Sequence, residues 1–197
     1  MRVLLRFPLL LASQSPRREQ ILRMLGFEFT IVPSDIDEII PDGMAAEKVP
    51  EELARVKARH VSRLHRKNLV LGADTLVMLD DRILGKPSGP EEAIEMLRFL
   101  VGRTHRVYTG VALALDGEVV ASGVECSDVT FAQWGEAELR KYVDTGEPMD
   151  KAGAYAIQGR GAFLVEGIHG CFFNVMGLPV QRTLRLLEPF AADVSGK

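Results

Sequence analysis

Apolar and polar residues follow two different spacings along this chain, one typical of strands and one typical of helices. Residues 8–12 form an apolar run, which predicts a buried first strand. The polar residues after it lead into a helix that begins at Pro16, with Ser15 as its N-cap. Gly26 ends the helical pattern. The predicted apolar face of this helix consists of Ile21, Leu22, Met24 and Leu25.

The alternation continues through most of the chain and predicts an α/β fold with a mixed, twisted sheet flanked by helices. Further strands are predicted at residues 27–32, 69–79, 83–84, 106–115, 118–131 and 162–168. Further helices are predicted at residues 51–66, 90–101, 136–143 and 180–187. Asp116-Gly117 predicts a hairpin turn, which argues against a purely parallel sheet. Residues 34–43 and 150–161 are predicted as loops, and residues 191–197 as a frayed tail.

Composition limits the classes of function. The 197 residues are enough for one domain, and 47% hydrophobic with 26% charged residues is typical of a globular protein. The net charge of -3 argues against a general nucleic-acid or anionic membrane surface. The start of the chain is similar to a short signal peptide, but Arg6 and Pro8 interrupt it, and no apolar stretch is long enough to span a membrane. Cys126 and Cys171 are interpreted as reduced thiols in the core, which favours the cytoplasm.

Two arginines in the first turn of the first helix predict an anion site. On a helical wheel Arg17 and Arg18 lie on the side of the apolar residues, close to the free N–H groups of the helix start. A buried cation needs a partner, and the oxygens of a phosphate chain suit the guanidinium group. The alternative is a capped helix whose arginines extend to solvent. The Ser13-Gln14-Ser15-Pro16 start favours the anion site.

Lys57 is the second candidate, because it lies near the centre of the apolar face of the helix at residues 51–66. Two interpretations are open. The side chain extends to solvent, as is common for such a lysine, or its ammonium group binds a phosphate or carboxylate. We favour the anion because the inward arginines predict one as well. His60 on the same face is interpreted as a packed core histidine.

Asp74 and Thr75 form the third candidate, at the end of the apolar run at residues 70–73. In open α/β sheets, sites form at the carboxyl ends of strands. A carboxylate there can hold a metal ion or take a proton from water. The alternative is an Asp that caps a turn, but the chain continues as an extended apolar run. Lys86 follows in a turn and by itself is typical of a solvated loop lysine.

Several familiar sites are missing from the sequence. It has no P-loop motif, no Gly-x-Ser-x-Gly motif and no Cys/His spacing typical of zinc. Trp134 is interpreted as a surface-packing residue.

Taken together and in order, the motifs over residues 9–188 resemble the Maf family of nucleoside triphosphate pyrophosphatases. They are Leu11-Ala12-Ser13-Gln14-Ser15-Pro16-Arg17-Arg18, Asp37-Glu38, Lys57, Leu71-Gly72-Ala73-Asp74-Thr75, Gly85-Lys86-Pro87, Thr109-Gly110-Val111-Ala112, Asp150-Lys151-Ala152-Gly153-Ala154-Tyr155-Ala156-Ile157-Gln158-Gly159 and Asn174-Val175-Met176-Gly177-Leu178-Pro179.

The resemblance implies a single domain over residues 1–197, similar to the inosine triphosphate pyrophosphatases, with two lobes and a central cleft. It implies cleavage of dTTP and UTP, or of modified pyrimidine nucleotides, to the monophosphate and pyrophosphate. Asp74 matches the general base that is proposed for the family. Arg17, Thr75 and Gln158 match residues that are linked to substrate choice.

The resemblance and the candidates together give a full set of expected roles. Glu38 and Asp74 are expected to bind a divalent ion, Mg²⁺ or Mn²⁺. The expected partner is a nucleoside triphosphate, without nucleic acid or membrane, and the resemblance allows a homodimer. The alternative function is a nucleotide-responsive regulator of septum formation that binds without turnover. The expected substrate-binding residues are Ser13, Arg17, Arg18, Lys57, Thr75, Lys86 and Gln158.

Overall fold

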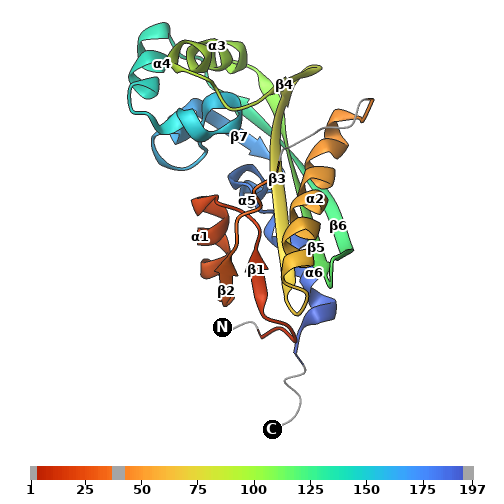
Figure 1. Cartoon of the computed structure of the whole chain (residues 1–197). Helices are drawn as coiled ribbons and strands as arrows, with labels where there is room; N and C mark the ends of the chain where they lie inside the picture. The colour runs from red at the N-terminus through yellow and green to blue at the C-terminus, as the bar shows by residue number, and fades with distance from the viewer. Residues whose placement is uncertain (1–3, 37–42, 193–197) are drawn as a thin grey trace. The chain divides into compact units, whose positions relative to one another are not determined.

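Strands and helices alternate along the chain in the computed structural model, which describes residues 4–36 and 43–192 (Figure 1). The strands are β1 (Leu9–Leu11), β2 (Phe29–Ile31), β3 (Leu69–Leu79), β4 (Arg82–Leu84), β5 (Thr104–Leu115), β6 (Glu118–Phe131) and β7 (Val165–His169). The α-helices are α1 (Pro16–Met24), α2 (Val49–Leu64), α3 (Pro90–Leu100), α4 (Glu136–Val143), α5 (Phe172–Met176) and α6 (Val180–Leu187). The 3-10 helices are η1 (Ala46–Lys48), η2 (Glu147–Asp150), η3 (Ala152–Ala154), η4 (Gly159–Leu164) and η5 (Glu188–Phe190).

The strands form one mixed sheet in the order β2-β1-β3-β5-β6-β7, with β4 paired to β3. β1 is parallel to β2 and β3, whereas β4 is antiparallel to β3 and β7 is antiparallel to β6. Asp116 and Gly117 have φ angles of 52° and 84°, the two positive values that a tight hairpin turn requires. The predicted mixed sheet and its hairpin are therefore confirmed.

The chain divides into two compact units, and β3, β5 and β6 contribute residues to both. The first unit holds the described residues up to Asp74, then Thr109–Glu125 and the described residues from Gly177 onward. The second unit holds Thr75–Tyr108 and Cys126–Met176. The central cleft that the resemblance implies stays a prediction.

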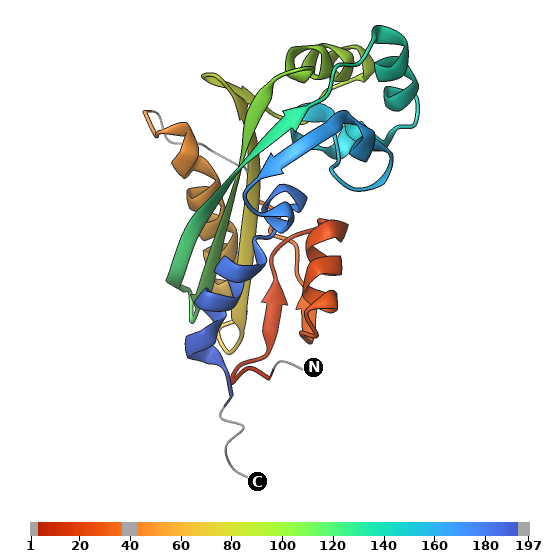
Figure 2. The same ribbon diagram turned by 180° about the vertical axis from the view of Figure 1, so that it is seen from behind.

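Small apolar residues let helix and sheet approach closely in the first unit. α2 covers one face of this unit's strands, and α6 lies on the opposite face, in front of the strands in Figure 2. Val32 packs against the core beneath α2, which consists of Leu10, Ala12, Ala54, Ala58, Val61, Val70, Ala112 and Ala114.

The second unit combines two helices with an aromatic core. α3 and α4 lie side by side (Figure 1), and Arg98 on α3 donates from Nε to Glu136 on α4 at 2.6 Å. His105, Phe131 and Tyr155 pack edge to face, with ring centroids 4.8 to 5.3 Å apart. No helix in the described ranges is long and apolar enough to cross a membrane.

Several predicted details are wrong. His60 is exposed rather than packed in the core, and Leu64 is 71% exposed, because the buried face of α2 centres on its two alanines and Lys57. Met24 is 59% exposed for a similar reason, since only Ile21 and Leu22 of α1 are buried.

Two further differences concern the second half of the chain. The strand predicted at residues 162–168 is a 3-10 helix followed by β7, and α5 was not predicted. The tail predicted at residues 191–197 is anchored where it begins. Ala191 bridges Leu5, and the Ala192 N–H donates to the Leu4 carbonyl at 3.0 Å. Residues 193–197 lie outside the described ranges.

Candidate functional site

The first unit contains a topological switch point between β1 and β3. The chain leaves β1 for β2 on one side, and it returns through α2 to β3 on the other. The parallel register pairs Leu11 with Leu71, and the Ala12 N–H donates to the Leu71 carbonyl at 2.8 Å. Ligands of open α/β sheets bind outside the carboxyl ends of strands at such points. Ser13 and Arg18 follow the end of β1, whereas Asp74 lies within β3, three residues beyond Leu71, because this strand continues to Leu79.

Ser13 organises the turn that joins β1 to α1. It is 8% exposed, and its Oγ accepts hydrogen bonds from the Ser15 N–H at 3.2 Å and from Arg18 Nη1 at 2.9 Å. Arg18 also donates from Nε to the Gly177 carbonyl at 2.8 Å. Ser15 is the N-cap residue, as predicted, but its side chain makes no capping bond. The hydroxyl that fixes this turn is that of Ser13.

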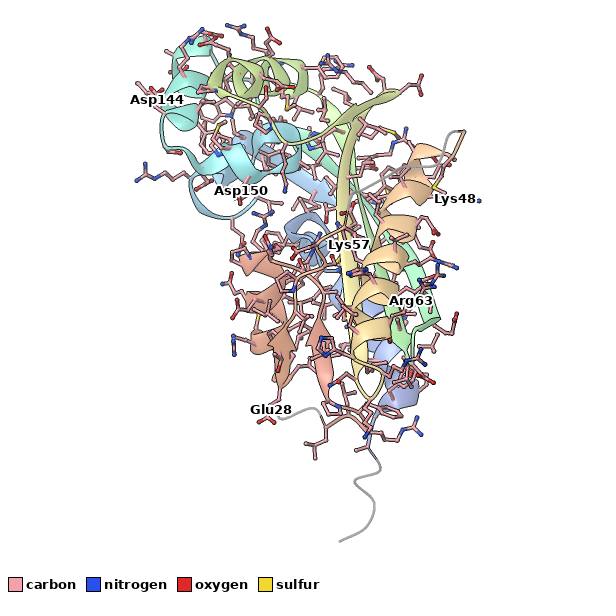
Figure 3. All side chains as sticks on the ribbon, viewed as in Figure 1. Glu28, Lys48, Lys57, Arg63, Asp144 and Asp150 are labelled. Carbon is pink, nitrogen blue, oxygen red and sulfur yellow. The ribbon has the colours of Figure 1, made fainter. Side chains whose placement is uncertain are left out.

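Two glycines set how closely α2 lies on the sheet. A Cβ at Gly72 would lie 2.9 Å from the Ala58 backbone nitrogen and would collide with the Ala54 carbonyl. A Cβ at Gly110 would collide with the backbone of Pro50. Side chains at these positions would force the helix away from β3 and β5. The close packing brings Lys57 on α2 to the strand that carries Asp74 (Figure 3).

Lys57 and Asp74 form an ion pair at this point. The Nζ of Lys57 donates to Oδ1 of Asp74 at 2.6 Å, and the two side chains are only 11% and 14% exposed. Such a pair is held away from most of the solvent, so each charge depends on its partner. The prediction that Lys57 faces an anion is right in kind. The anion in the structure is the chain's own carboxylate, which the sequence analysis did not connect to Lys57.

Two further predicted residues, Arg17 and Glu38, precede Lys57 in the sequence. Arg17 is half-buried in the first turn of α1, next to Arg18. The helix ends in a Schellman turn, in which the Phe27 N–H donates to the Leu22 carbonyl at 3.2 Å and Gly26 has φ of 80°. Glu38, the second predicted metal ligand, lies outside the described residues.

Thr75, Lys86 and Gln158 belong to the second unit. Thr75 is half-buried in β3, Lys86 is exposed after β4, and Gln158 is half-buried immediately before η4. The Gly153 N–H donates to the Gly85 carbonyl at 2.9 Å. This bond ties the segment that carries Lys86 to the segment that carries Gln158.

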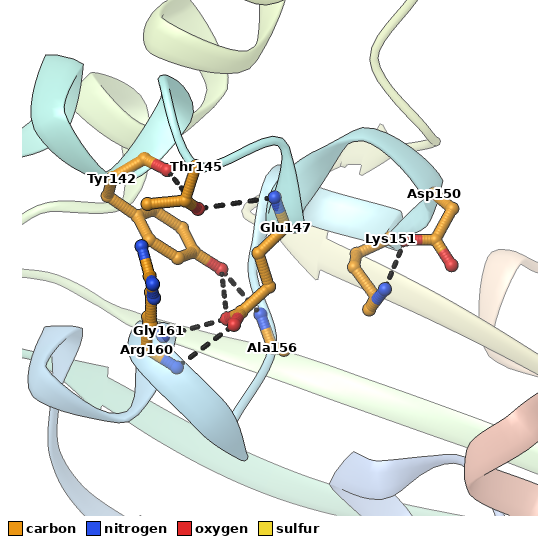
Figure 4. Close-up of polar contacts among 8 residues, drawn as sticks. All are labelled: Tyr142, Thr145, Glu147, Asp150, Lys151, Ala156, Arg160 and Gly161. Carbon is orange, nitrogen blue, oxygen red and sulfur yellow. Dashed lines mark hydrogen bonds and ion pairs between the residues drawn. The ribbon is translucent and has the colours of Figure 1, made fainter.

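A polar network that the sequence analysis missed surrounds Glu147 (Figure 4). Its carboxylate accepts hydrogen bonds from the Tyr142 hydroxyl at 3.0 Å and from the N–H groups of Arg160 at 3.0 Å and Gly161 at 2.8 Å. Burial alone would raise the pKa of Glu147, but these three bonds and the charge of Lys151 lower it on balance. Glu147 is therefore ionised at neutral pH. In the sequence, the only signal for this network was the pair of closely spaced glycines, Gly159 and Gly161. In the structure, oxygen atoms next to both glycines leave no room for side chains.

His105 contacts Tyr155, the residue before Ala156 in the same part of the chain. Its Nε2 lies 2.8 Å from the Tyr155 hydroxyl, and burial lowers the pKa of His105 to about 4. Burial raises the pKa of Tyr155. Both groups are therefore neutral at pH 7 and pack as part of the core.

Comparison with known proteins places the chain in a family. The sequence model for Maf-like proteins matches residues 8–190. The chain belongs to the Maf family. A Maf relative from Moorella thermoacetica, named dTTP/UTP pyrophosphatase, is 50% identical over 96% of this chain and 98% of its own length. One from Desulforamulus reducens with the same name is 42% identical over 95% and 98% of the two chains.

A solved structure gives a weaker similarity. The dITP/XTP pyrophosphatase of Mycobacterium abscessus is 16% identical, with a TM-score of 0.41 over 92% of this Maf chain and 94% of its own.

Two further features of this Maf protein concern ligands. Within residues 4–36 and 43–192, no group of three or more His, Cys, Asp or Glu side chains is placed to hold a metal ion. A cavity of about 310 Å³ in the second unit is formed by other residues than the predicted ones. It is lined by Trp134, Glu138, Lys141, Tyr142, Thr145, Arg160 and Phe163. Trp134 packs edge to face on Phe163 there, which confirms its packing role.

Proposed function

We propose that this Maf protein hydrolyses dTTP and UTP between the α and β phosphates, giving the monophosphate and pyrophosphate. The observation that carries the proposal is the Lys57–Asp74 pair, which lies in the unit that contains the switch point between β1 and β3. The 42% and 50% identical relatives, both named dTTP/UTP pyrophosphatase, support the choice of reaction and substrate.

In this mechanism Asp74 takes a proton from the attacking water. The water oxygen forms a bond to the α phosphorus, and the bond from that phosphorus to the bridging oxygen breaks, so that pyrophosphate leaves with its electron pair. Lys57 holds the Asp74 carboxylate in place and compensates its charge. Arg17 binds phosphate oxygens at the N-terminus of α1, and Arg18, fixed by Ser13, adds positive charge at the same edge.

A divalent ion is part of the proposal. Asp74 offers the oxygen ligand that Mg²⁺ and Mn²⁺ prefer, and Mg²⁺ in phosphate-transfer sites needs only one or two carboxylates besides the substrate. Glu38 would be the second carboxylate. When bound, the ion supplies charge neutralisation for the phosphates.

The second unit is proposed to supply recognition. The amide of Gln158 can donate and accept at once, as the carbonyl and ring N–H of a pyrimidine require. Lys86 adds a cation for the phosphate chain, and Thr75 contributes to selectivity. We place the protein in the cytoplasm. Cys126 is exposed and Cys171 half-buried, so neither lies in the core as predicted, but neither forms a disulfide, which agrees with a reducing compartment. The relatives carry enzyme names, and they give the regulatory alternative no support.

A nucleotide panel tests this function. Purified protein is incubated with Mg²⁺ or Mn²⁺ and each of the common nucleoside triphosphates, and the pyrophosphate released is measured. We expect dTTP and UTP to have the highest kcat/KM. Binding of dTTP without any turnover would contradict the enzyme proposal and favour the regulator.

A further inference from the structure

Gln158 lies in a segment with little regular structure of its own. Residues 155–157, between η3 and Gln158, have no helix or strand, and Gly159 after it has φ of 73°, in the left-handed region. An amide that distinguishes one base from another needs a fixed direction, because a hydrogen-bond site rejects an analogue only when its polar groups cannot turn away. The neighbouring contacts must therefore hold this backbone.

Glu147 and Tyr142 hold the segment on both sides of Gln158. The Tyr142 hydroxyl accepts a hydrogen bond from the Ala156 N–H at 3.1 Å, two residues before Gln158. The Glu147 carboxylate accepts those of Arg160 and Gly161, two and three residues after it. The Tyr142 hydroxyl donates to Glu147, so the two anchors are one connected network (Figure 4).

The two glycines that follow Gln158 have no room for side chains, because oxygen atoms of this network lie next to them. A Cβ at Gly159 would lie 2.7 Å from Oε2 of Glu147. A Cβ at Gly161 would lie 2.5 Å from the Tyr142 hydroxyl. The oxygens thus occupy the space that side chains would take, so the backbone lies directly on the carboxylate and the phenol.

The residues of this network are held by α4 and by the turn that follows it. Tyr142 is on α4 and is 2% exposed. Thr145 donates from Oγ1 to the Tyr142 carbonyl at 2.6 Å and accepts the Glu147 N–H at 3.2 Å. Glu147 is therefore held against the end of a helix.

We infer that Glu147 is a positioning residue for base selection, which fixes the direction of the Gln158 amide through Tyr142 and the N–H groups of residues 160–161. This inference rests on the proposed role of Gln158 as the reader of the base. Glu147 touches no substrate in this scheme. Its loss lowers the preference for pyrimidine nucleotides, because the amide is then free to pair with other bases.

The test compares kcat/KM for UTP with that for GTP. Glu147→Gln keeps the size but replaces one acceptor oxygen by an NH₂ group that faces backbone N–H donors. We expect the UTP/GTP ratio to fall about tenfold, the equivalent of one hydrogen bond to a charged group. Glu136→Gln, which removes a carboxylate of α4 bound to Arg98 and Arg140, is the matched control and should leave the ratio unchanged.

A double variant separates this inference from the proposed function. Gln158→Ala should lower the ratio by itself, and adding Glu147→Gln to it should lower the ratio no further. If Gln158→Ala lowers the ratio and Glu147→Gln does not, the inference is wrong and the proposed function stands. If Gln158→Ala leaves the ratio unchanged, base reading by Gln158 is wrong, and the role of Glu147 is wrong with it.

A second variant covers the case in which Glu147→Gln fails to fold. Tyr142→Phe removes one hydroxyl and should lower the UTP/GTP ratio in the same direction by a smaller factor. A merely structural role predicts instead that kcat/KM for both nucleotides falls by the same factor, which would overturn the inference.

Discussion

Lys57 and Asp74 compensate each other's charge at the middle of β3, and the proposed mechanism depends on this pair. Asp74→Asn keeps the shape and an oxygen that can accept from Lys57, but it removes the base. We expect kcat for dTTP to fall about a hundredfold or more, the scale of general-base loss, with the fold retained. Steady-state kinetics and circular dichroism measure the two effects. Near-wild-type turnover in the folded variant would remove Asp74 from the mechanism.

The same pair predicts a stability effect that can be separated from activity. Lys57→Met leaves a mostly buried carboxylate without its ammonium partner, and we expect it to lose about 3 kcal/mol of unfolding free energy. Adding Asp74→Leu removes the orphaned charge and should recover most of that loss while the protein stays inactive. Urea unfolding measures all three proteins. An equal loss in the single and double variants would show that the charge pair is not the cause.

Ser13 and Ser15 offer a matched comparison in one turn. Ser13→Ala removes the acceptor for the Ser15 N–H and for Arg18, so we expect a loss of about 1 kcal/mol and weaker binding of all nucleotides. Ser15→Ala should be nearly neutral, because its side chain makes no capping bond. Thermal unfolding and KM values test this. A larger effect for Ser15→Ala would contradict the assignment of the turn.

Among elements, the position of α2 on the sheet determines whether Lys57 reaches Asp74. Gly72→Ala would push a methyl group against Ala54 and Ala58, and the helix backbone must move to relieve it. We expect a loss of about 2 kcal/mol, the cost of overpacking a core, together with a drop in kcat. Gly167→Ala in β7 is the control, since nothing lies within 4 Å of the added Cβ. Equal effects in the two variants would contradict this role of Gly72.

Elements with a strong local pattern were predictable from the sequence, and those set by tertiary contacts were not. β1, α3 and the β5–β6 hairpin follow from an apolar run, a helical period and a two-residue turn. Residues 159–161 of η4 were predicted as loop and residues 162–164 as strand. The backbone there follows the hydrogen bonds to Glu147, which no hydrophobic period in the sequence reveals.

The site shows the same division. Each of Lys57 and Asp74 was identified from its own surroundings. Their pairing needed Gly72 and Gly110 to bring α2 onto the sheet, a close approach that no local pattern reveals. The face of α2 that holds His60 was misassigned because Ala54, Lys57, Ala58 and Ser62 contribute to the buried face, and these residues carry little hydrophobic signal.

For the whole molecule, His105 gives stability a dependence on pH. Its pKa is about 4 in the folded state and about 6.5 when unfolded, so the unfolded chain binds more protons between those values. The contribution of neutral His105 is therefore complete above about pH 6.5 and is lost as the pH falls toward 4, by roughly 3 kcal/mol in total. We expect His105→Gln to show a flatter decline in urea unfolding between pH 7 and pH 4.5. His169→Gln, at an exposed site, should decline like the wild type, and a decline unchanged in His105→Gln would contradict this assignment.

Water attack at the α phosphorus is the central step proposed for the whole protein, and hydrolysis of dTTP in H₂¹⁸O tests it most directly. The products dTMP and pyrophosphate are separated, and the position of the label is read by mass spectrometry. We expect one ¹⁸O atom in dTMP and none in pyrophosphate, because the oxygen that joins the α phosphorus comes from water. Label in pyrophosphate would mean attack at the β phosphorus, and release of dTDP with labelled phosphate would mean attack at the γ phosphorus. Either result would contradict a site in which Asp74 directs water to the α phosphorus.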